Sequence, residues 1–187
     1  RMTVVRLNNG VLWLHSPIPL SESLQRELDT LGTVSYLISP NKIHYYYISD
    51  AQKAYPHALT YASPGVRGRA KKHNVSIRWD KELDVKEPHP WQSEIAQVVL
   101  RGGRFMEEVV FFHQTSKTLI LADFVENFER QKIPLHLQLL AWMAGILAPR
   151  GGVPKDQQLT YWGRTGTLRS SLEEILKLDF TQIILAH

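Results

Sequence analysis

The sequence predicts an α+β protein in which two β-sheets are sandwiched between layers of helices, a four-layer αββα arrangement. Strand-like runs rich in β-branched and aromatic residues occur in two blocks, one in the first third of the chain and one at residues 95–123, and helical patterns follow each block. The 187 residues are 43% hydrophobic and 21% charged, which suffices for one substantial core. We therefore expect a single domain over residues 1–187.

Composition excludes several kinds of site. The chain has no cysteine, so disulfides, thiolate nucleophiles and cysteine-based zinc sites are absent, and a metal would have to be bound by imidazole and carboxylate groups. No apolar run of 18 residues occurs, and Arg1–Arg6 lacks the apolar core of a signal peptide. These features predict a cytoplasmic protein without a membrane span.

The formal net charge of +4 raises the question of nucleic-acid binding. Only one run is densely basic, at Arg67–His73, and the other basic residues are scattered. A solvated loop is the favoured interpretation of this run over a phosphate-contacting patch. Nucleic acid is therefore not an expected partner.

The first block opens with a β-hairpin. Thr3–Leu7 and Val11–His15 are β-rich, and the Asn8–Gly10 turn between them ends in Asn-Gly, the strongest short hairpin signal. A helix follows, with Ser21 as its N-cap and Gly32 at its end.

A βαβ unit comes next. Val34–Ile38 and Leu59–Ala62 are strand-like, and Ile43–Tyr55 between them reads as a helix whose first turn carries His44. Such a unit implies parallel strands with a right-handed crossover. Ligands bind at the carboxyl ends of such strands. His44 follows the strand Val34–Ile38 and therefore lies where a site residue is expected.

Residues 71–90 are polar and predict a loop with one short strand at Val75–Trp79. Beyond them, Ile95–Leu100 and Phe105–Phe112 begin a three-stranded meander, whose last hairpin turns at Gln114–Lys117 and ends at Asp123. His113 closes the first strand of this hairpin and Asp123 closes the second.

The last third predicts two helices and a strand. Pro134–Leu147 has an apolar face so broad that it suggests a well-buried helix, and Thr167–Leu176 carries a narrower apolar face. The final strand, Phe180–Ala186, delivers His187.

Four potential metal ligands thus share a position next to a strand end: His44, His113, Asp123 and His187. A lone histidine is more often a packing or surface residue than a ligand. The occurrence of four such residues at strand ends nevertheless favours a common site. Catalytic metal sites use three or four such ligands and keep one position for water. One divalent ion is expected, zinc first, with iron and manganese suited to the same ligands.

The order of these elements resembles the metallo-β-lactamase fold. That family carries a His-x-His-x-Asp-His box after the strand that here is Val34–Ile38. Placing His44 on the last histidine of the box leaves Ser39, Asn41 and Ile43 where the family has His, His and Asp. The resemblance thus implies an eroded box in a divergent branch.

The resemblance also distributes the remaining ligands. His113 would match the family's lone mid-chain histidine, Asp123 its bridging aspartate and His187 its terminal histidine. This set argues against an ordinary two-metal hydrolase and for a single metal at His44, Asp123 and His187, with His113 as a further candidate.

Two functions from different classes remain open. The first is a metal-dependent hydrolase-like protein whose small-molecule substrate the sequence does not specify, and whose catalytic acid and base it does not identify. The alternative is a non-catalytic member that has lost its metal and serves as a ligand- or partner-binding domain. Enzymatic activity is therefore uncertain at this stage.

Overall fold

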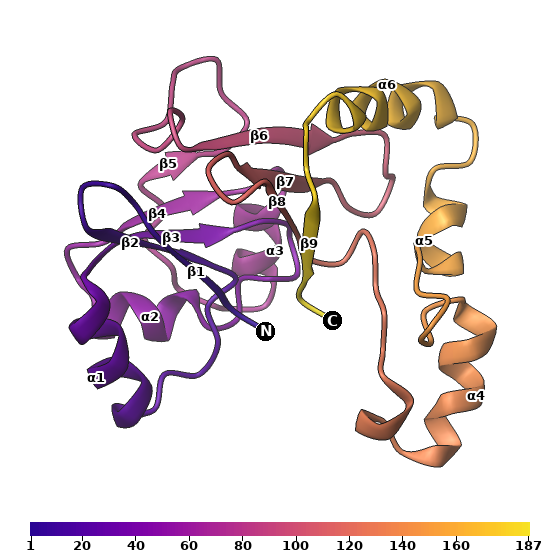
Figure 1. Ribbon diagram of the computed structural model, residues 1–187, viewed down its shortest axis with the longest axis horizontal. Coiled ribbons are helices and arrows are strands. Elements are labelled where there is room, and N and C mark those ends of the chain that lie inside the picture. Colours follow the sequence, from indigo (N-terminus) through magenta and orange to yellow (C-terminus); the bar gives the residue numbers. More distant parts are fainter.

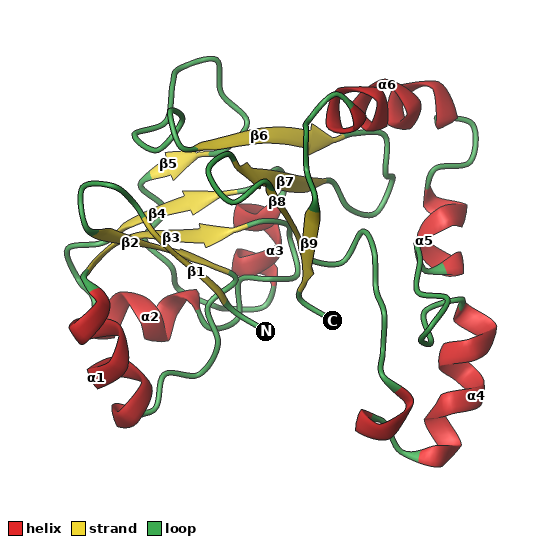
Figure 2. Ribbon diagram, in the orientation of Figure 1, coloured by secondary structure: helices red, strands yellow, loops and turns green.

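The computed structural model describes all residues, 1–187, and contains two β-sheets with six α-helices. The first sheet has the strand order β1-β2-β3-β4-β5 and the second the order β6-β7-β8-β9 (Figures 1 and 2). The strands are β1 (Thr3–Arg6), β2 (Val11–His15), β3 (Thr33–Ser39), β4 (Leu59–Ala62), β5 (Lys81–Glu82), β6 (Ile95–Leu100), β7 (Glu108–His113), β8 (Thr118–Leu121) and β9 (Gln182–Leu185). The helices are α1 (Glu22–Leu31), α2 (Ile48–Ala54), α3 (Val66–Lys72), α4 (Leu135–Ala144), α5 (Lys155–Thr160) and α6 (Thr165–Leu176), with one 3₁₀ turn at Arg130–Lys132.

Strand pairing follows the predicted connections. The Asn-Gly turn joins β1 and β2 in an antiparallel hairpin, and β3 and β4 are parallel across the α2 crossover. In the second sheet β6, β7 and β8 form the predicted antiparallel meander, and β9 adds parallel to β8. The carboxyl ends of β2, β3, β8 and β9 thereby become available for one site.

Alternating side chains build three apolar layers. Leu12 and Leu14 of β2 pack with α1, α2 and α3 on the outer face of the first sheet, whereas Trp13 points inward to the core between the sheets. In the second sheet, Phe111 faces this central core and Val110 packs toward α6. The result is the four-layer αββα sandwich that the sequence predicts.

The structure corrects three local predictions in the first half. The helix predicted at Ile43–Tyr55 begins only at Ile48, so His44 lies in a turn before α2 rather than in a helix. The basic run predicted as a loop forms α3, and Val75–Trp79 is not a strand. Residues 74–80 instead pass over the sheet and lead into β5, which pairs with β4.

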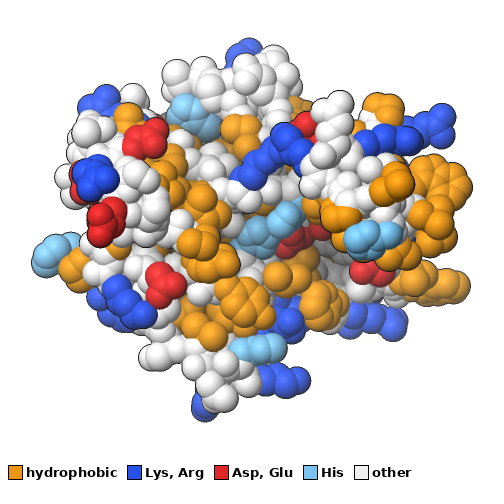
Figure 3. Space-filling model, turned by 90° about the horizontal axis from the view of Figure 1, so that it is seen from below, with side chains coloured by type: hydrophobic (Ala, Val, Ile, Leu, Met, Phe, Trp, Pro, Cys, Tyr) orange, Lys and Arg blue, Asp and Glu red, His pale blue; other side chains and the backbone are white.

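Helix α4 is also different from its prediction. Its apolar residues are not buried: Leu135 is 81% exposed and Trp142 is 63% exposed, and Ala141 is the only buried residue of the helix. The helix projects at the end of the molecule, beyond the second sheet (Figure 1). Figure 3 shows hydrophobic side chains gathered on that side. The broad apolar face predicts burial, but α4 does not pack on either sheet.

Helix α5 lies between the two helices that the sequence predicts in the last third of the chain, in a segment for which it predicts no element. None of the helices has the length and apolar character needed to cross a bilayer.

His15, the last residue of β2, lies fully inside the protein. Its ring stacks on Trp13 at 5.7 Å between centroids and meets the edge of Phe111 at 5.6 Å. Burial, reinforced by the nearby His44, lowers the pKa of His15 to about 3. His15 is therefore neutral in the folded protein at every pH at which most proteins stay folded.

This depressed pKa predicts a pH dependence of stability. In the unfolded chain His15 takes up a proton below about pH 6.5, whereas in the folded protein it does so only near pH 3, so acid favours unfolding in between. Replacing His15 by Phe removes this effect. We expect the free energy of unfolding of the wild type to fall, relative to His15→Phe, by about 1.4 kcal/mol per pH unit between pH 6 and pH 4. Urea unfolding at several pH values measures this difference, and a difference that stays constant with pH would contradict the assignment.

Candidate metal centre

Three of the four predicted ligands meet at one edge of the sandwich. Asp123 follows β8 by two residues and His187 follows β9 by two residues, and the parallel register that pairs Leu121 with Leu185 brings them side by side. His44 comes from the other sheet, in the turn after β3. The site therefore joins the two sheets.

The three side chains point at one another through single atoms. Asp123 Oδ1 lies 3.0 Å from His44 Nε2 and 3.1 Å from His187 Nε2. The two Nε2 atoms are 3.4 Å apart. One potential ligand atom from each residue thus lies within 4.8 Å of the others, so the three residues could hold one metal ion together.

Ser16 fixes the ring of His44. Its hydroxyl forms a hydrogen bond with His44 Nδ1, and this leaves Nε2 directed at Asp123. Ser16 directly follows β2, is buried, and is held by a hydrogen bond from its backbone N–H to the carbonyl of Ile38. Since a hydroxyl both donates and accepts, it can serve either tautomer of the imidazole.

Asn41 fixes the carboxylate of Asp123. Its side-chain oxygen accepts hydrogen bonds from the backbone N–H groups of Ile43 and His44, which sets the orientation of the amide. The amide nitrogen then donates to Asp123 Oδ2 at 2.8 Å and to Glu108 Oε2 at 2.9 Å. As a result Asp123 presents Oδ1, and not Oδ2, to the two histidines.

Glu108 anchors the loop that carries Asp123. This fully buried carboxylate accepts hydrogen bonds from the backbone N–H groups of Ala122, Asp123 and Phe124 at 2.8, 2.8 and 3.2 Å. Burial and the charge of Asp123 raise the pKa of Glu108, and the hydrogen bonds it accepts oppose that rise. Glu108 therefore fixes the main chain at Asp123 and with it the position of the Asp123 side chain.

The electrostatics of the cluster follow from these contacts. Burial would raise the pKa of Asp123, but hydrogen bonds from His187, His44 and Asn41 outweigh it and hold the pKa below its usual value. The same hydrogen bond to Asp123 raises the pKa of His187. Asp123 is consequently a carboxylate, and therefore a competent metal ligand, at neutral pH.

His113, the fourth predicted ligand, is not part of this cluster. The antiparallel register pairs it with Thr118 at the turn of the hairpin, where its Nδ1 forms a 2.7 Å hydrogen bond with Ser116. Asp123 lies at the other end of the same hairpin, next to Glu108 at the start of β7. The prediction treated the end of β7 and the end of β8 as neighbours, but antiparallel strands finish at opposite edges.

Two cavities reach the cluster from different sides. One of about 220 Å³ is lined by His44 and His187 together with Tyr46 and Tyr47. The other, of about 430 Å³, is lined by Asp123 and Glu126 and by apolar residues that include Phe105. Ile43 lines both cavities, so they flank the same turn.

Glu126 is the second carboxylate of the larger cavity. Burial, together with the charge of Asp123, raises the pKa of Glu126 to about 6. It can therefore exchange a proton near neutral pH beside the candidate ligands.

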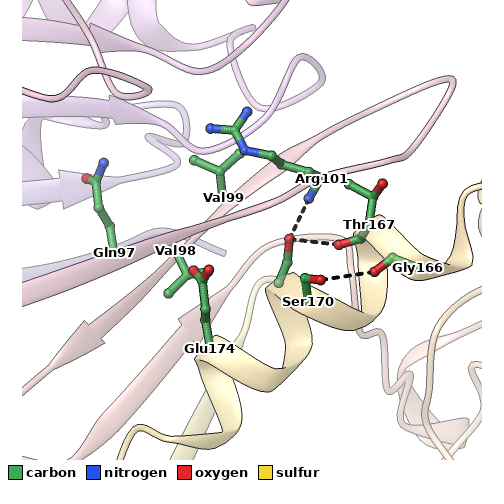
Figure 4. A pocket seen from close by; sticks show the side chains of 9 residues that line it. Gln97, Val98, Val99, Arg101, Gly166, Thr167, Ser170 and Glu174 are labelled. Carbon is green, nitrogen blue, oxygen red and sulfur yellow. Dashed lines mark hydrogen bonds between the residues drawn. The ribbon is translucent and has the colours of Figure 1, made fainter.

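A cavity larger than these two lies elsewhere. It measures about 610 Å³ and runs between β6 and α6 (Figure 4). Ser171 accepts a hydrogen bond from the backbone N–H of Arg101 there, and the Arg101 guanidinium is paired with Asp84. It shares no residue with the two cavities at the cluster.

Three residues that position the candidate ligands were not predicted as functional: Ser16, Asn41 and Glu108. Asn41 had a readable signal, because Pro-Asn after a strand favours a turn in which the asparagine oxygen caps the following N–H groups. Ser16 and Glu108 had none, since their roles depend on contacts with residues distant in sequence.

Comparison with solved structures defines the class. The chain aligns over 100% of its length with TTHA1623 in a di-iron-bound form (TM-score 0.53, 16% identity, 86% of that chain) and with the metallo-β-lactamase DIM-1 exposed to ceftazidime (TM-score 0.61, 16% identity, 83% of that chain). It also aligns over 99% of its length with the metal-soaked Flv1 flavodiiron core of Synechocystis sp. PCC6803 (TM-score 0.58, 10% identity), spanning 47% of that chain. The protein has the metallo-β-lactamase fold.

The chain belongs to the family described as "Domain of unknown function (DUF4336)", whose model matches residues 1–144. The matched residues include His44 and Asp123, whereas His187 lies beyond them. No curated protein sequence matches the chain.

The anchoring role of Glu108 leads to a stability prediction. Glu108→Ala leaves three backbone N–H groups without their acceptor, and each unsatisfied group costs about 1–3 kcal/mol. We expect the free energy of unfolding to fall by about 3 kcal/mol or more, as measured by urea unfolding. The neighbouring Glu107, which is half-buried and accepts only from Gly102 N–H, is the control, and Glu107→Ala should cost far less. Equal losses in the two variants would contradict the anchoring role.

Proposed function

We propose that the protein is a metal-dependent hydrolase with one divalent ion bound by His44, Asp123 and His187. The observation that carries this proposal is the convergence of three ligand atoms of the right chemistry beside two cavities. When bound, such an ion supplies Lewis acidity, which lowers the pKa of water and polarises a carbonyl or phosphoryl oxygen. Hydrolysis of an ester, amide or phosphoester is the corresponding class of reaction.

The donor atoms fit a small ion without large movements. A tetrahedral ion with ligands at about 2.0–2.1 Å separates any two of them by about 3.3 Å. The three separations here are 3.0, 3.1 and 3.4 Å. The hydrogen bond between the Ser16 hydroxyl and His44 Nδ1, on the far side of the ring, is the kind of outer contact that orients a metal-bound histidine.

The hydrogen bond between Asn41 and Asp123 Oδ2 favours one ion over two. It uses the second carboxylate oxygen, so Asp123 has one oxygen left for a metal. His113, which the resemblance assigned to another ion, lies at the far end of its hairpin. A single-metal site with three protein ligands remains.

Glu126 is the residue best suited to accept a proton from the attacking water. It lines the larger cavity with Asp123, and a pKa of about 6 places its change of charge near the pH at which a general base is most effective. Asp156 is the third carboxylate that lines the same cavity.

The identity of the ion is the open part of the proposal. Nitrogen and carboxylate ligands suit zinc, iron and manganese. Two of the similar structures are named for di-iron centres, so iron belongs in the test beside zinc.

Metal analysis tests the site directly. We expect about one equivalent of metal per chain after purification without chelator, and strong loss of metal in His44→Ala and in His187→Ala. Added metal at about 100 times its Kd should stabilise the folded wild type by about 2.7 kcal/mol, because it binds only the folded form. Hydrolysis of chromogenic esters and phosphodiesters by the same samples tests the reaction.

His113→Ala is the matched control, since it removes a histidine outside the cluster and should keep its metal. Metal content that is low in the wild type and unchanged by all three variants would reject the site. Stoichiometric metal without hydrolysis by the wild type would reject the proposed reaction but support the proposed metal site.

Ser16→Ala tests the orienting contact. Loss of an outer hydrogen bond to a metal-bound histidine typically lowers affinity about 10- to 100-fold. We expect that loss in Ser16→Ala, with the fold intact, when metal is titrated against a competing chelator. An unchanged affinity would show that Ser16 only fills space.

A further inference from the structure

Two basic side chains are set apart from all others by their burial. Of the 22 lysines and arginines, only Lys42 and Arg69 are not exposed. Lys42 directly follows Asn41 of the site, and Arg69 lies on α3. They come together over one aromatic ring, since the Lys42 ammonium is 4.3 Å and the Arg69 guanidinium carbon 5.5 Å from the centre of Phe105.

Neither cation has a negatively charged partner. Arg67, on the same helix as Arg69, is paired with Glu82, and Arg101 with Asp84, but no carboxylate pairs with Lys42 or Arg69. The Nε of Arg69 is buried and has no acceptor. Partly burying two neighbouring positive charges without a counter-ion is costly, and a ring face offsets only part of that cost.

Two like charges beside one ring repel each other, and an anion bound to both would relieve that repulsion.

The pair stands beside the candidate metal centre. Phe105, which carries both cations, also lines the 430 Å³ cavity that contains Asp123. Ile43, next to Lys42 in the chain, lines the same cavity. The two cations do not line the cavity themselves, but an anion held by the pair would lie next to Phe105, which does.

We propose that Lys42 and Arg69, which both lie beside Phe105, bind a phosphoryl group of a small-molecule substrate. Two positive charges match a phosphate monoester, which carries about −1.5 to −2 at pH 7, better than a carboxylate. The guanidinium fork of Arg69 suits phosphate oxygens. The phosphoryl site is independent of a metal, and its role in substrate binding rests on the proposed hydrolase function.

The test is calorimetric titration of the full-length chain with inorganic phosphate, and separately with acetate, at low ionic strength. We expect phosphate to bind more tightly than acetate. Lys42→Gln and Arg69→Gln should each weaken phosphate binding about tenfold or more, the usual effect of losing a charge-assisted hydrogen bond. Lys72→Gln, which removes an exposed charge from the same helix, should leave it unchanged.

Two further variants make the result decisive. Lys42→Arg keeps the charge and should retain binding, which separates loss of charge from loss of fold. His187→Ala removes a proposed metal ligand and should also retain phosphate binding. Metal content measured on the same samples keeps the two proposals apart, since phosphate binding without metal supports the anion site and rejects the metal centre.

Three outcomes would overturn the proposal. The first is equal phosphate affinity in Lys42→Gln and Lys72→Gln. The second is loss of phosphate binding in His187→Ala, which would place the phosphate on the metal. The third is equal affinity for acetate and phosphate.

Discussion

The buried carboxylate of Glu108 holds together the edge of the sandwich at which the site is built. It binds the main chain after β8 through three N–H groups and the turn after β3 through the amide of Asn41. The segment after β8 belongs to the second sheet, whereas the turn after β3 belongs to the first sheet. Glu108 therefore connects the two sheets. A hydrogen bond from Val109 N–H to the carbonyl of Pro40 extends the same junction. Displacing Glu108 would therefore separate the candidate ligands even if each remained on its own strand.

The contacts at this junction determine which oxygen of Asp123 faces the two histidines. Its two oxygens have different partners, because Asn41 donates to one and both histidines meet the other. Only Oδ1 is therefore directed at the two histidines, whereas an unrestrained aspartate could turn either oxygen toward an ion. The position that the resemblance gives to a ligand histidine is thus occupied by Asn41, which orients the candidate ligand Asp123.

Much of the fold was predictable because it depends on local patterns. The Asn-Gly hairpin, the βαβ unit and the meander each carry their signals within a few residues, and all three are confirmed. The exposure of helix α4 was not predictable, because an apolar sequence does not show whether another element covers the helix. The proximity of Asp123 and His187 was predictable, because each lies just after a strand and the two strands are parallel. His113 lies apart from them, because antiparallel pairing puts the end of its strand at the opposite edge. The contacts of Ser16 and Glu108 were not predictable, because their partners are distant in the sequence.

The distances along the chain between the clustered residues bear on how the protein folds. Asp123 lies 79 residues from His44, and His187 lies 143 residues from it. No local segment preorganises these groups, and closing such long loops is slow because its entropic cost comes before any contact compensates for it. The cluster can therefore assemble only when both sheets have formed and docked. Contact among its three side chains is a marker of the last stage of folding, and partly folded chains would have no such cluster.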